Sequence, residues 1–155
     1  MKRFTAGVLV ILLAACISTA ALGKKSGSSY LVVTQFPEGR ELGRWELGQE
    51  KGFSLSFIHS VSKTPVVDVY AVRANSIVQT REHFRAHGAG LPSNSDEPHG
   101  LSWEKKGDDF ILHMERPIPK LVVRTDRNYR NRLIIGNDRI DLNQWEDQAL
   151  LLYID

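Results

Sequence analysis

Short runs of alternating hydrophobic and polar residues occupy most of the chain after its first thirty positions. The clearest run, 53–57, reads Phe-Ser-Leu-Ser-Phe, and strict alternation places its three large side chains on one face of a strand. Further runs rich in β-branched and aromatic residues follow, each bounded by glycine, proline or asparagine. The strands expected on this basis are 30–36, 42–47, 53–57, 66–72, 77–84, 101–104, 110–114, 121–125, 133–135, 139–142 and 149–154.

Turn residues separate these runs. Pro37-Glu38-Gly39, Gly107-Asp108 and Gly136-Asn137-Asp138 have the composition of tight turns, and 88–100 is expected to be a loop. Helical periodicity is limited to a short turn expected at 143–148. The pattern predicts an all-β fold, a single antiparallel sandwich or barrel-like domain covering residues 30–155.

The amino terminus has the organisation of a secretory signal. Lys2-Arg3 precedes an apolar run over 4–15, which is too short for a permanent membrane span. Leu13-Ala14-Ala15-Cys16 resembles a bacterial lipobox, in which the cysteine is lipidated and becomes the new amino terminus. We expect a signal peptide over 1–15, lipidation at Cys16, a flexible tether over 16–29 and a location on the periplasmic face of a bacterial membrane.

A second interpretation of this segment is a soluble periplasmic protein. Ordinary signal peptidase would cut near Ala21 or Gly23, and Cys16 would be incidental. In either case the mature domain has no other cysteine, so neither an intrachain disulfide nor a thiolate metal site is expected.

Charge argues against nucleic acid as a partner. The chain has 20 Lys+Arg and 18 Asp+Glu, and removal of Lys2 and Arg3 with the signal leaves 18 against 18. A nearly neutral domain lacks the field that draws proteins to polyanions. Four arginines in 124–132 form a solvated strand edge on one interpretation and a patch for an anionic ligand or lipid headgroups on another.

His59 and Ser60 are adjacent at the end of an expected strand. Successive strand residues point to opposite faces, so a direct Ser–His catalytic pair is geometrically poor, and no Gly-x-Ser-x-Gly elbow occurs in the chain. We predict no catalytic residue. The alternatives are a contact with a ligand or partner and a structural role, in which Ser60 caps a turn and His59 bonds to backbone.

Gly88-Ala89-Gly90-Leu91-Pro92 is the second candidate segment. Two glycines around one residue allow positive φ and a close approach of the backbone to an anion, or a tight structural corner. His83 and His87 are four residues apart, a spacing that places two imidazoles on one face only on a helix. A loop could instead gather His87 and His99 with Asp96 or Glu97, and the alternative is a set of exposed loop histidines. No metal and no cofactor are expected.

These segments together resemble a known family. The motif Phe57-Ile58-His59-Ser60-Val61 is followed by Lys63-Thr64-Pro65-Val66 and the acidic Asp68, then by the 88–92 segment and by Arg-Pro-Ile-Pro-Lys-Leu at 116–121. This order is similar to that of the small exported bacterial proteins grouped as domain of unknown function 1850. That family often has glutamate at the position of Asp68 and a non-histidine aromatic residue at that of His87.

The resemblance implies a role beside transporters. Members of the family resemble partners of TAXI-type TRAP transporters, ion-driven importers with a permease and an extracytoplasmic solute-binding protein. The function expected is a lipid-anchored accessory protein that contacts the permease or its solute-binding protein. The alternative is a small-molecule or anion-binding module that senses the transported substrate. The contact residues expected are His59, Ser60, Asp68, Gly88, Gly90, Leu91 and Pro92.

Overall fold

The computed structural model describes residues 28–49, 51–86, 90–92 and 96–155. The described residues form eleven strands in two antiparallel sheets, which do not close into a barrel. The all-β prediction is confirmed, and the architecture is that of a sandwich. The expected signal peptide and Cys16 lie outside the described residues.

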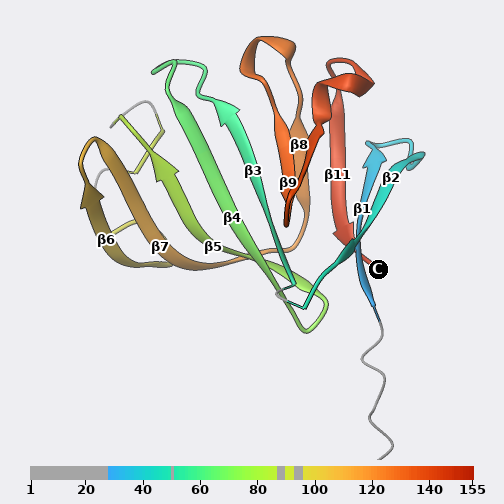
Figure 1. Ribbon diagram of the computed structural model, residues 1–155, viewed down its shortest axis with the longest axis horizontal. Coiled ribbons are helices and arrows are strands. Elements are labelled where there is room, and N and C mark those ends of the chain that lie inside the picture. The colour runs from blue at the N-terminus through green and yellow to red at the C-terminus, as the bar shows by residue number, and fades with distance from the viewer. Residues whose placement is uncertain (1–27, 50, 87–89, 93–95) are drawn as a thin grey trace, which may run out of the picture.

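The smaller sheet has four strands and the larger has seven (Figure 1). In spatial order the first contains β2 (Glu41–Leu47), β1 (Ser29–Gln35), β11 (Ala149–Ile154) and β8 (Leu121–Arg124). The second contains β10 (Asp138–Asp141), β9 (Arg132–Ile135), β3 (Gly52–Ile58), β4 (Pro65–Arg73), β5 (Ser76–Phe84), β7 (Asp109–Ile118) and β6 (Gly100–Lys106).

Each expected strand corresponds to an observed one, and the largest difference concerns β7. The alternation ends at Met114, but the strand continues to Ile118, because Arg116 and Ile118 pair with Gln79 and Ile77 of β5. The helical turn expected at 143–148 is a 3₁₀ helix, η2 (Leu142–Trp145), and a second one, η1 (Arg127–Tyr129), follows β8. Among the described residues, no helix is long and apolar enough to cross a membrane.

Two separate hydrophobic clusters fill the interior. The first lies between the two sheets and includes the fully buried Leu31, Leu133 and Leu152. The second consists of Val66, Phe84, Leu91, Leu112 and Met114. Leu91 comes from the connection between β5 and β6, so the second cluster includes a residue from outside the eleven strands.

The two ends of the sandwich differ. β1 begins beside the carboxyl terminus, where Tyr30 and Asp155 exchange backbone hydrogen bonds of 2.8 and 2.9 Å. At the opposite end, which we call the distal end, lie the β3–β4 turn (59–64), η1 with its flanks (125–131) and η2 with its flanks (142–148) (Figure 1). Lys63 lies over the Tyr129 ring at 5.4 Å, so the first two of these segments are in contact.

Candidate functional site

Two acidic residues face each other across neighbouring strands inside the sandwich. Asp68 of β4 is the direct partner of Glu82 of β5, so both side chains point to the same face of the sheet. Asp68 also pairs with Leu55, and Glu82 with Leu112. Leu55 belongs to the first hydrophobic cluster and Leu112 to the second, so the carboxyls lie on the interior face between two apolar regions.

A β-bulge completes the polar group around these carboxyls. Tyr70 pairs with Gln79 and Val69 with Arg81, so β5 has one extra residue at Thr80. Because of this residue, Gln79 and Glu82 point to the same face although they are three positions apart. We call the resulting set the carboxyl cluster; it consists of Asp68, Tyr70, Gln79, Glu82 and Arg116.

Hydrogen bonds link the members of the carboxyl cluster. The Asp68 carboxylate accepts from Tyr70 Oη at 3.3 Å and from Gln79 Nε2 at 3.0 Å. Arg116 donates to Gln79 Oε1 at 3.3 Å. In the described part of the chain the Glu82 carboxyl has no hydrogen bond and no ion pair. The cluster therefore has one well-bonded carboxyl, one carboxyl without a partner and one guanidinium nearby.

Burial changes the protonation of both acids. It raises the pKa of Asp68 to about 6, against the opposing effects of the Tyr70 hydroxyl, Arg116 and Gln79. Burial, and then the adjacent Asp68, raise the pKa of Glu82 to about 7. The pKa of Tyr70 is also raised, by burial first and then by Asp68. The pair therefore titrates near neutral pH, which is typical of functional sites but also occurs in structural networks.

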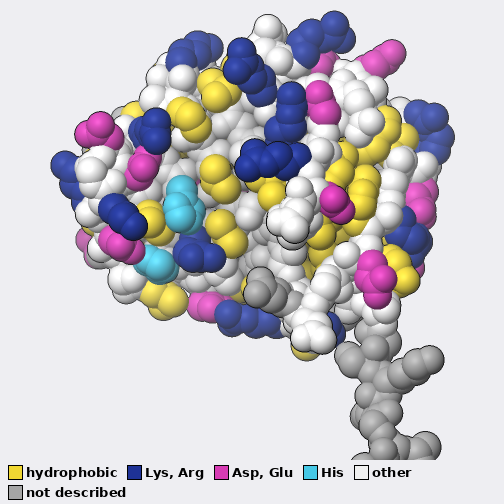
Figure 2. Space-filling model, viewed as in Figure 1, with side chains coloured by type: hydrophobic (Ala, Val, Ile, Leu, Met, Phe, Trp, Pro, Cys, Tyr) yellow, Lys and Arg dark blue, Asp and Glu magenta, His cyan; other side chains and the backbone are white. Residues whose placement is uncertain are grey.

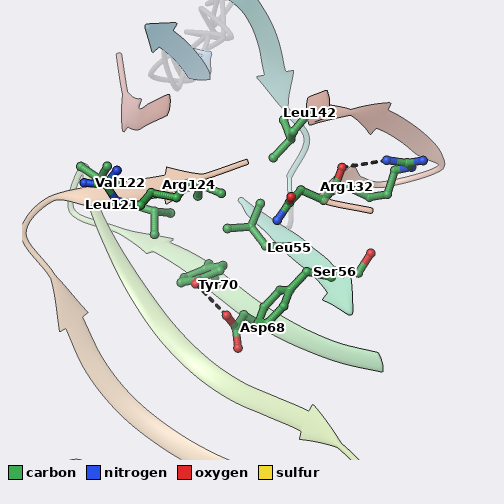
Figure 3. A pocket seen from close by; sticks show the side chains of 12 residues that line it. Leu55, Ser56, Asp68, Tyr70, Leu121, Val122, Arg124, Arg132 and Leu142 are labelled. Atoms are coloured by element: carbon green, nitrogen blue, oxygen red, sulfur yellow. Dashed lines mark hydrogen bonds between the residues drawn. The ribbon is translucent and has the colours of Figure 1, made fainter. Parts of the chain in front are cut away.

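A cavity of about 230 Å³ opens onto Asp68 (Figure 3). All four residues of β8, an edge strand of the smaller sheet, line one side of it. In Figure 3 Asp68 and Tyr70 point toward one another on the opposite wall, while the Arg132 guanidinium points away from them. The residues that line the cavity are Leu55, Ser56, Phe57, Asp68, Tyr70, Leu121, Val122, Val123, Arg124, Asn131, Arg132 and Leu142.

His59 organises the β3–β4 turn. Its Nδ1 accepts from the backbone N–H of Ser62 at 3.1 Å and lies 3.4 Å from that of Val61. The hydroxyl in contact with this nitrogen is that of Ser62, at 3.1 Å, whereas Ser60 is exposed. His59 thus has the structural role that the sequence left as an alternative, and its turn presents Val61, which is 66% exposed.

The segment before β6 has both exposed and buried members. Gly90 is exposed at φ +91, a conformation that favours glycine, whereas Leu91 and Pro92 are buried. Leu91 packs in the cluster that contains Val66 and the partly buried Phe57, both on the strands that flank the His59 turn. Gly88 lies outside the described residues, so its role as a contact stays a prediction.

The arginines of 124–132 divide into paired and unpaired members. Arg127 Nε lies 3.3 Å from Asp147 and Arg132 Nη1 lies 2.5 Å from Asp141. Within the described ranges Arg124 and Arg130 form no ion pair. In Figure 2 lysine and arginine side chains gather over the distal end.

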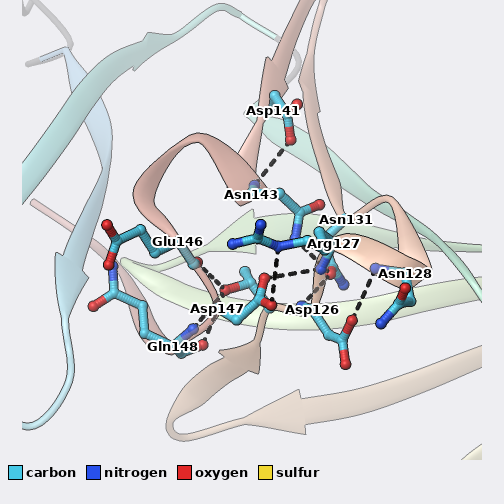
Figure 4. A network of polar contacts seen from close by, with 10 residues as sticks. Asp126, Arg127, Asn128, Asn131, Asp141, Asn143, Glu146, Asp147 and Gln148 are labelled. Carbon is cyan, nitrogen blue, oxygen red and sulfur yellow. Dashed lines mark hydrogen bonds and ion pairs between the residues drawn. The ribbon is translucent and has the colours of Figure 1, made fainter.

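A polar network joins the connections at the distal end (Figure 4). Thr125 Oγ1 lies 2.9 Å from the Glu146 carbonyl and 3.0 Å from that of Gln148. Asn131 Oδ1 accepts from the Asp126 N–H at 3.0 Å. These bonds join η1, η2 and their flanks, so these two connections at the distal end form one hydrogen-bonded unit.

Histidines on the outer face of the larger sheet do not form a metal site. His113 Nε2 lies 3.4 Å from Glu104, and burial and Arg81 lower the pKa of His83. Nowhere in the described ranges do three His, Cys, Asp or Glu residues lie close enough to hold a metal ion. His87 is not among the described residues.

Comparison with known proteins assigns the family. The family described as domain of unknown function (DUF1850) matches residues 53–142, more than half of the 155-residue chain, so this protein belongs to that family. The matched region extends from β3 to the start of η2 and contains the complete carboxyl cluster. Neither a curated protein nor a solved structure matched the chain.

Sequence reasoning identified one member of the carboxyl cluster and missed four. Asp68 was singled out by the resemblance. Tyr70, Gln79 and Glu82 lie within expected strands, and Arg116 lies beyond the expected end of β7. The only available signal was an acidic residue in each of two neighbouring apolar runs, and strand pairing was required to bring these two residues together.

Proposed function

We propose that this protein is an exported accessory protein of a TAXI-type TRAP transporter and that it acts by binding rather than by catalysis. Membership of the family supports this role through the resemblance described above. The signal-like amino terminus and the lipobox-like sequence ending at Cys16 support export and attachment to a membrane. The partner is the permease or its solute-binding protein.

The ordered His59 turn at the distal end is the observation that carries the proposal. His59 fixes the turn through bonds to its backbone, and Val61 at its tip exposes 66% of its surface. An apolar side chain on a preorganised turn contributes to a contact with little loss of conformational entropy. The ends of the β3–β4 hairpin are also linked, since His59 N–H donates to the Thr64 carbonyl at 2.9 Å.

The point at which the chain enters the domain agrees with this contact. Residues 17–28 separate Cys16 from β1, and twelve residues span at most about 40 Å when extended. β1 starts at the end opposite the His59 turn (Figure 1). With lipid at Cys16, the distal end is therefore the part of the domain best placed to extend away from the membrane.

Purification from native membranes in mild detergent tests the proposal. A carboxyl-terminally tagged protein is expected to recover a TAXI-type permease or solute-binding protein in stoichiometric amount, with lipid on Cys16 detected by mass spectrometry. Val61→Asp is expected to lose the partner and keep its fold. Leu101→Asp, at another exposed apolar residue, is the matched control and should retain the partner. Recovery of the tagged protein alone would contradict the proposal.

A second candidate function is the binding of a small molecule. It is favoured by the cavity of about 230 Å³ beside Asp68, in which a half-buried ionisable group meets apolar walls. Calorimetry with amino acids and dicarboxylates tests this function, with heat that saturates as the expected result. Absence of heat from every compound would leave the interaction role as the only proposal.

A further inference from the structure

We propose that the cavity between β8 and β4 binds a small organic ammonium ion, with its charge on the Asp68 carboxylate and its apolar body against Leu55, Phe57 and Leu121. This inference rests on the second candidate function and narrows it to one class of ligand. The ligand proposed here is a cation, whereas the sequence suggested an anion. The positions of the charged groups around the cavity favour the cation.

The charged group inside the cavity is a carboxyl. Asp68 lies on the interior face, where Phe53, Phe57 and Tyr70 occupy the neighbouring positions of β3 and β4. A carboxylate offers about four acceptor positions, and Asp68 uses two of them for Tyr70 and Gln79. The remaining positions can accept from an ammonium group, and such a charge-assisted bond is stronger than a neutral one.

The arginines that line the cavity are directed elsewhere. Arg132 is held by the Asn131 carbonyl at 2.9 Å and by Asp141 at 2.5 Å. Arg124 is exposed and alternates along β8 with the buried Leu121 and the half-buried Val123. Arg124 has no ion pair in the described part of the chain, but it lies on the exposed face of the strand. A cation entering the cavity would meet the Asp68 carboxylate as its counter-charge, whereas this carboxylate would repel an anion.

The apolar walls and the volume limit the ligand further. Leu55, Leu121 and Leu142 are buried and line the cavity together with Phe57. A volume of about 230 Å³ is below the roughly 300–1,000 Å³ of pockets for drug-sized molecules. These features fit a short alkylammonium ion, which occurs either as a free amine or as the end of a lysine side chain.

Binding is coupled to the protonation of Asp68. The carboxyl must be ionised to hold a cation, and burial raises its pKa to about 6. Ionisation favours binding at pH 8 over pH 5 by about tenfold, since roughly one Asp68 in ten is charged at pH 5. The titratable and charged groups around Asp68 are Tyr70 on β4, Glu82 on β5, Arg116 on β7, Arg124 on β8 and Arg132 on β9. Glu97, before β6, acts on the neighbouring Glu82.

Amide NMR titration of the domain with n-pentylammonium chloride tests the inference. Saturable shifts are expected at β8 and around Asp68, with a dissociation constant about tenfold lower at pH 8 than at pH 5. Asp68→Asn is expected to abolish the shifts, and Asp108→Asn, at an exposed acidic residue, should preserve them. Nα-acetyl-lysine methylamide is the second probe, and tighter binding of this probe would identify a lysine side chain as the source of the cation.

Two neutral or anionic probes provide the opposing results. Equal binding of 1-pentanol would show a purely apolar cavity, and preferential binding of valerate would show an anion site; either result would overturn the ammonium inference and keep the small-molecule function. If no probe shifts the amide signals, both the ammonium inference and the small-molecule function are overturned. If Asp68→Asn does not fold, equal affinity of the wild type at pH 5 and pH 8 overturns the inference.

Discussion

Asp68 and Glu82 lie directly opposite each other on β4 and β5, with both carboxyls on the interior face of the seven-stranded sheet. Like charges at such a cross-strand position are destabilising, and burial adds the cost of desolvation. Burial and, for Glu82, the neighbouring Asp68 raise the pKa of the two groups to about 6 and about 7. A pair of leucines at these two positions would pack without this repulsion and without the cost of desolvation.

The first prediction concerns the pH dependence of stability. Both folded-state pKa values are above their unfolded values, so the folded protein binds more protons between about pH 4 and pH 7. The contribution of the pair to the free energy of unfolding is therefore full at low pH and is lost as the pH rises through about 6 to 7. Urea unfolding of the wild type at pH 5 and pH 8 measures this loss.

Substitution of Asp68 isolates the pair as its cause. Asp68→Asn removes one of the two titrating carboxyls. From pH 5 to pH 8 the free energy of unfolding should therefore decrease in this variant by about 1–2 kcal/mol less than it decreases in the wild type. Glu38→Gln, at an exposed turn residue, should behave as the wild type. Parallel pH profiles for the wild type and Asp68→Asn would show that Asp68 does not titrate in this range.

The second prediction concerns Gly43 of β2. A Cβ added here would overlap the Trp45 indole, which lies 6.3 Å from the Trp145 ring between centroids. Gly43→Val should therefore lower stability by about 1–3 kcal/mol through overpacking and should shift the tryptophan fluorescence. Gly48→Ala is the matched control, because no atom lies within 4 Å of its added Cβ. An unchanged emission spectrum for Gly43→Val would refute the packing assigned to Trp45.

The third prediction concerns the second hydrophobic cluster. Leu112 is completely buried with Phe84 and Met114, so Leu112→Ala should cost about 2–5 kcal/mol in urea unfolding. Leu101→Ala, at a residue 65% exposed on the neighbouring β6, should change stability by less than about 0.5 kcal/mol. Similar losses in the two variants would mean that this half of the sheet is not a packed core.

The fourth prediction concerns the structural role of His59 in its turn. His59→Ala leaves the Ser62 N–H without its acceptor and should cost about 1–2 kcal/mol. His59→Asn should recover part of this loss, because an asparagine carbonyl accepts the same kind of local bond. Ser60→Ala should be neutral in thermal unfolding. A destabilisation by Ser60→Ala equal to that by His59→Ala would contradict the observed bonding of the turn.

The sequence by itself determined the strands and turns of this protein. Alternation over 53–57 and the β-branched runs specify extended backbone locally, and glycine, proline and asparagine interrupt it at the turns. Because these local signals specify strands and turns, the all-β fold could be predicted, and the structure confirms it. The family resemblance also drew attention to Asp68 and His59, which lie in ordered interior and turn positions.

Tertiary structure alone decided which side chains meet. The bulge at Thr80 turns Gln79 and Glu82 to one face, whereas simple alternation would place them on opposite faces. Pairing of β5 with β7 extends the latter beyond Met114 and brings Arg116 to Gln79. Register and sheet order depend on hydrogen bonds between strands, both consecutive ones such as β4 and β5 and distant ones such as β5 and β7. A one-residue shift between β4 and β5 would separate the carboxyl pair.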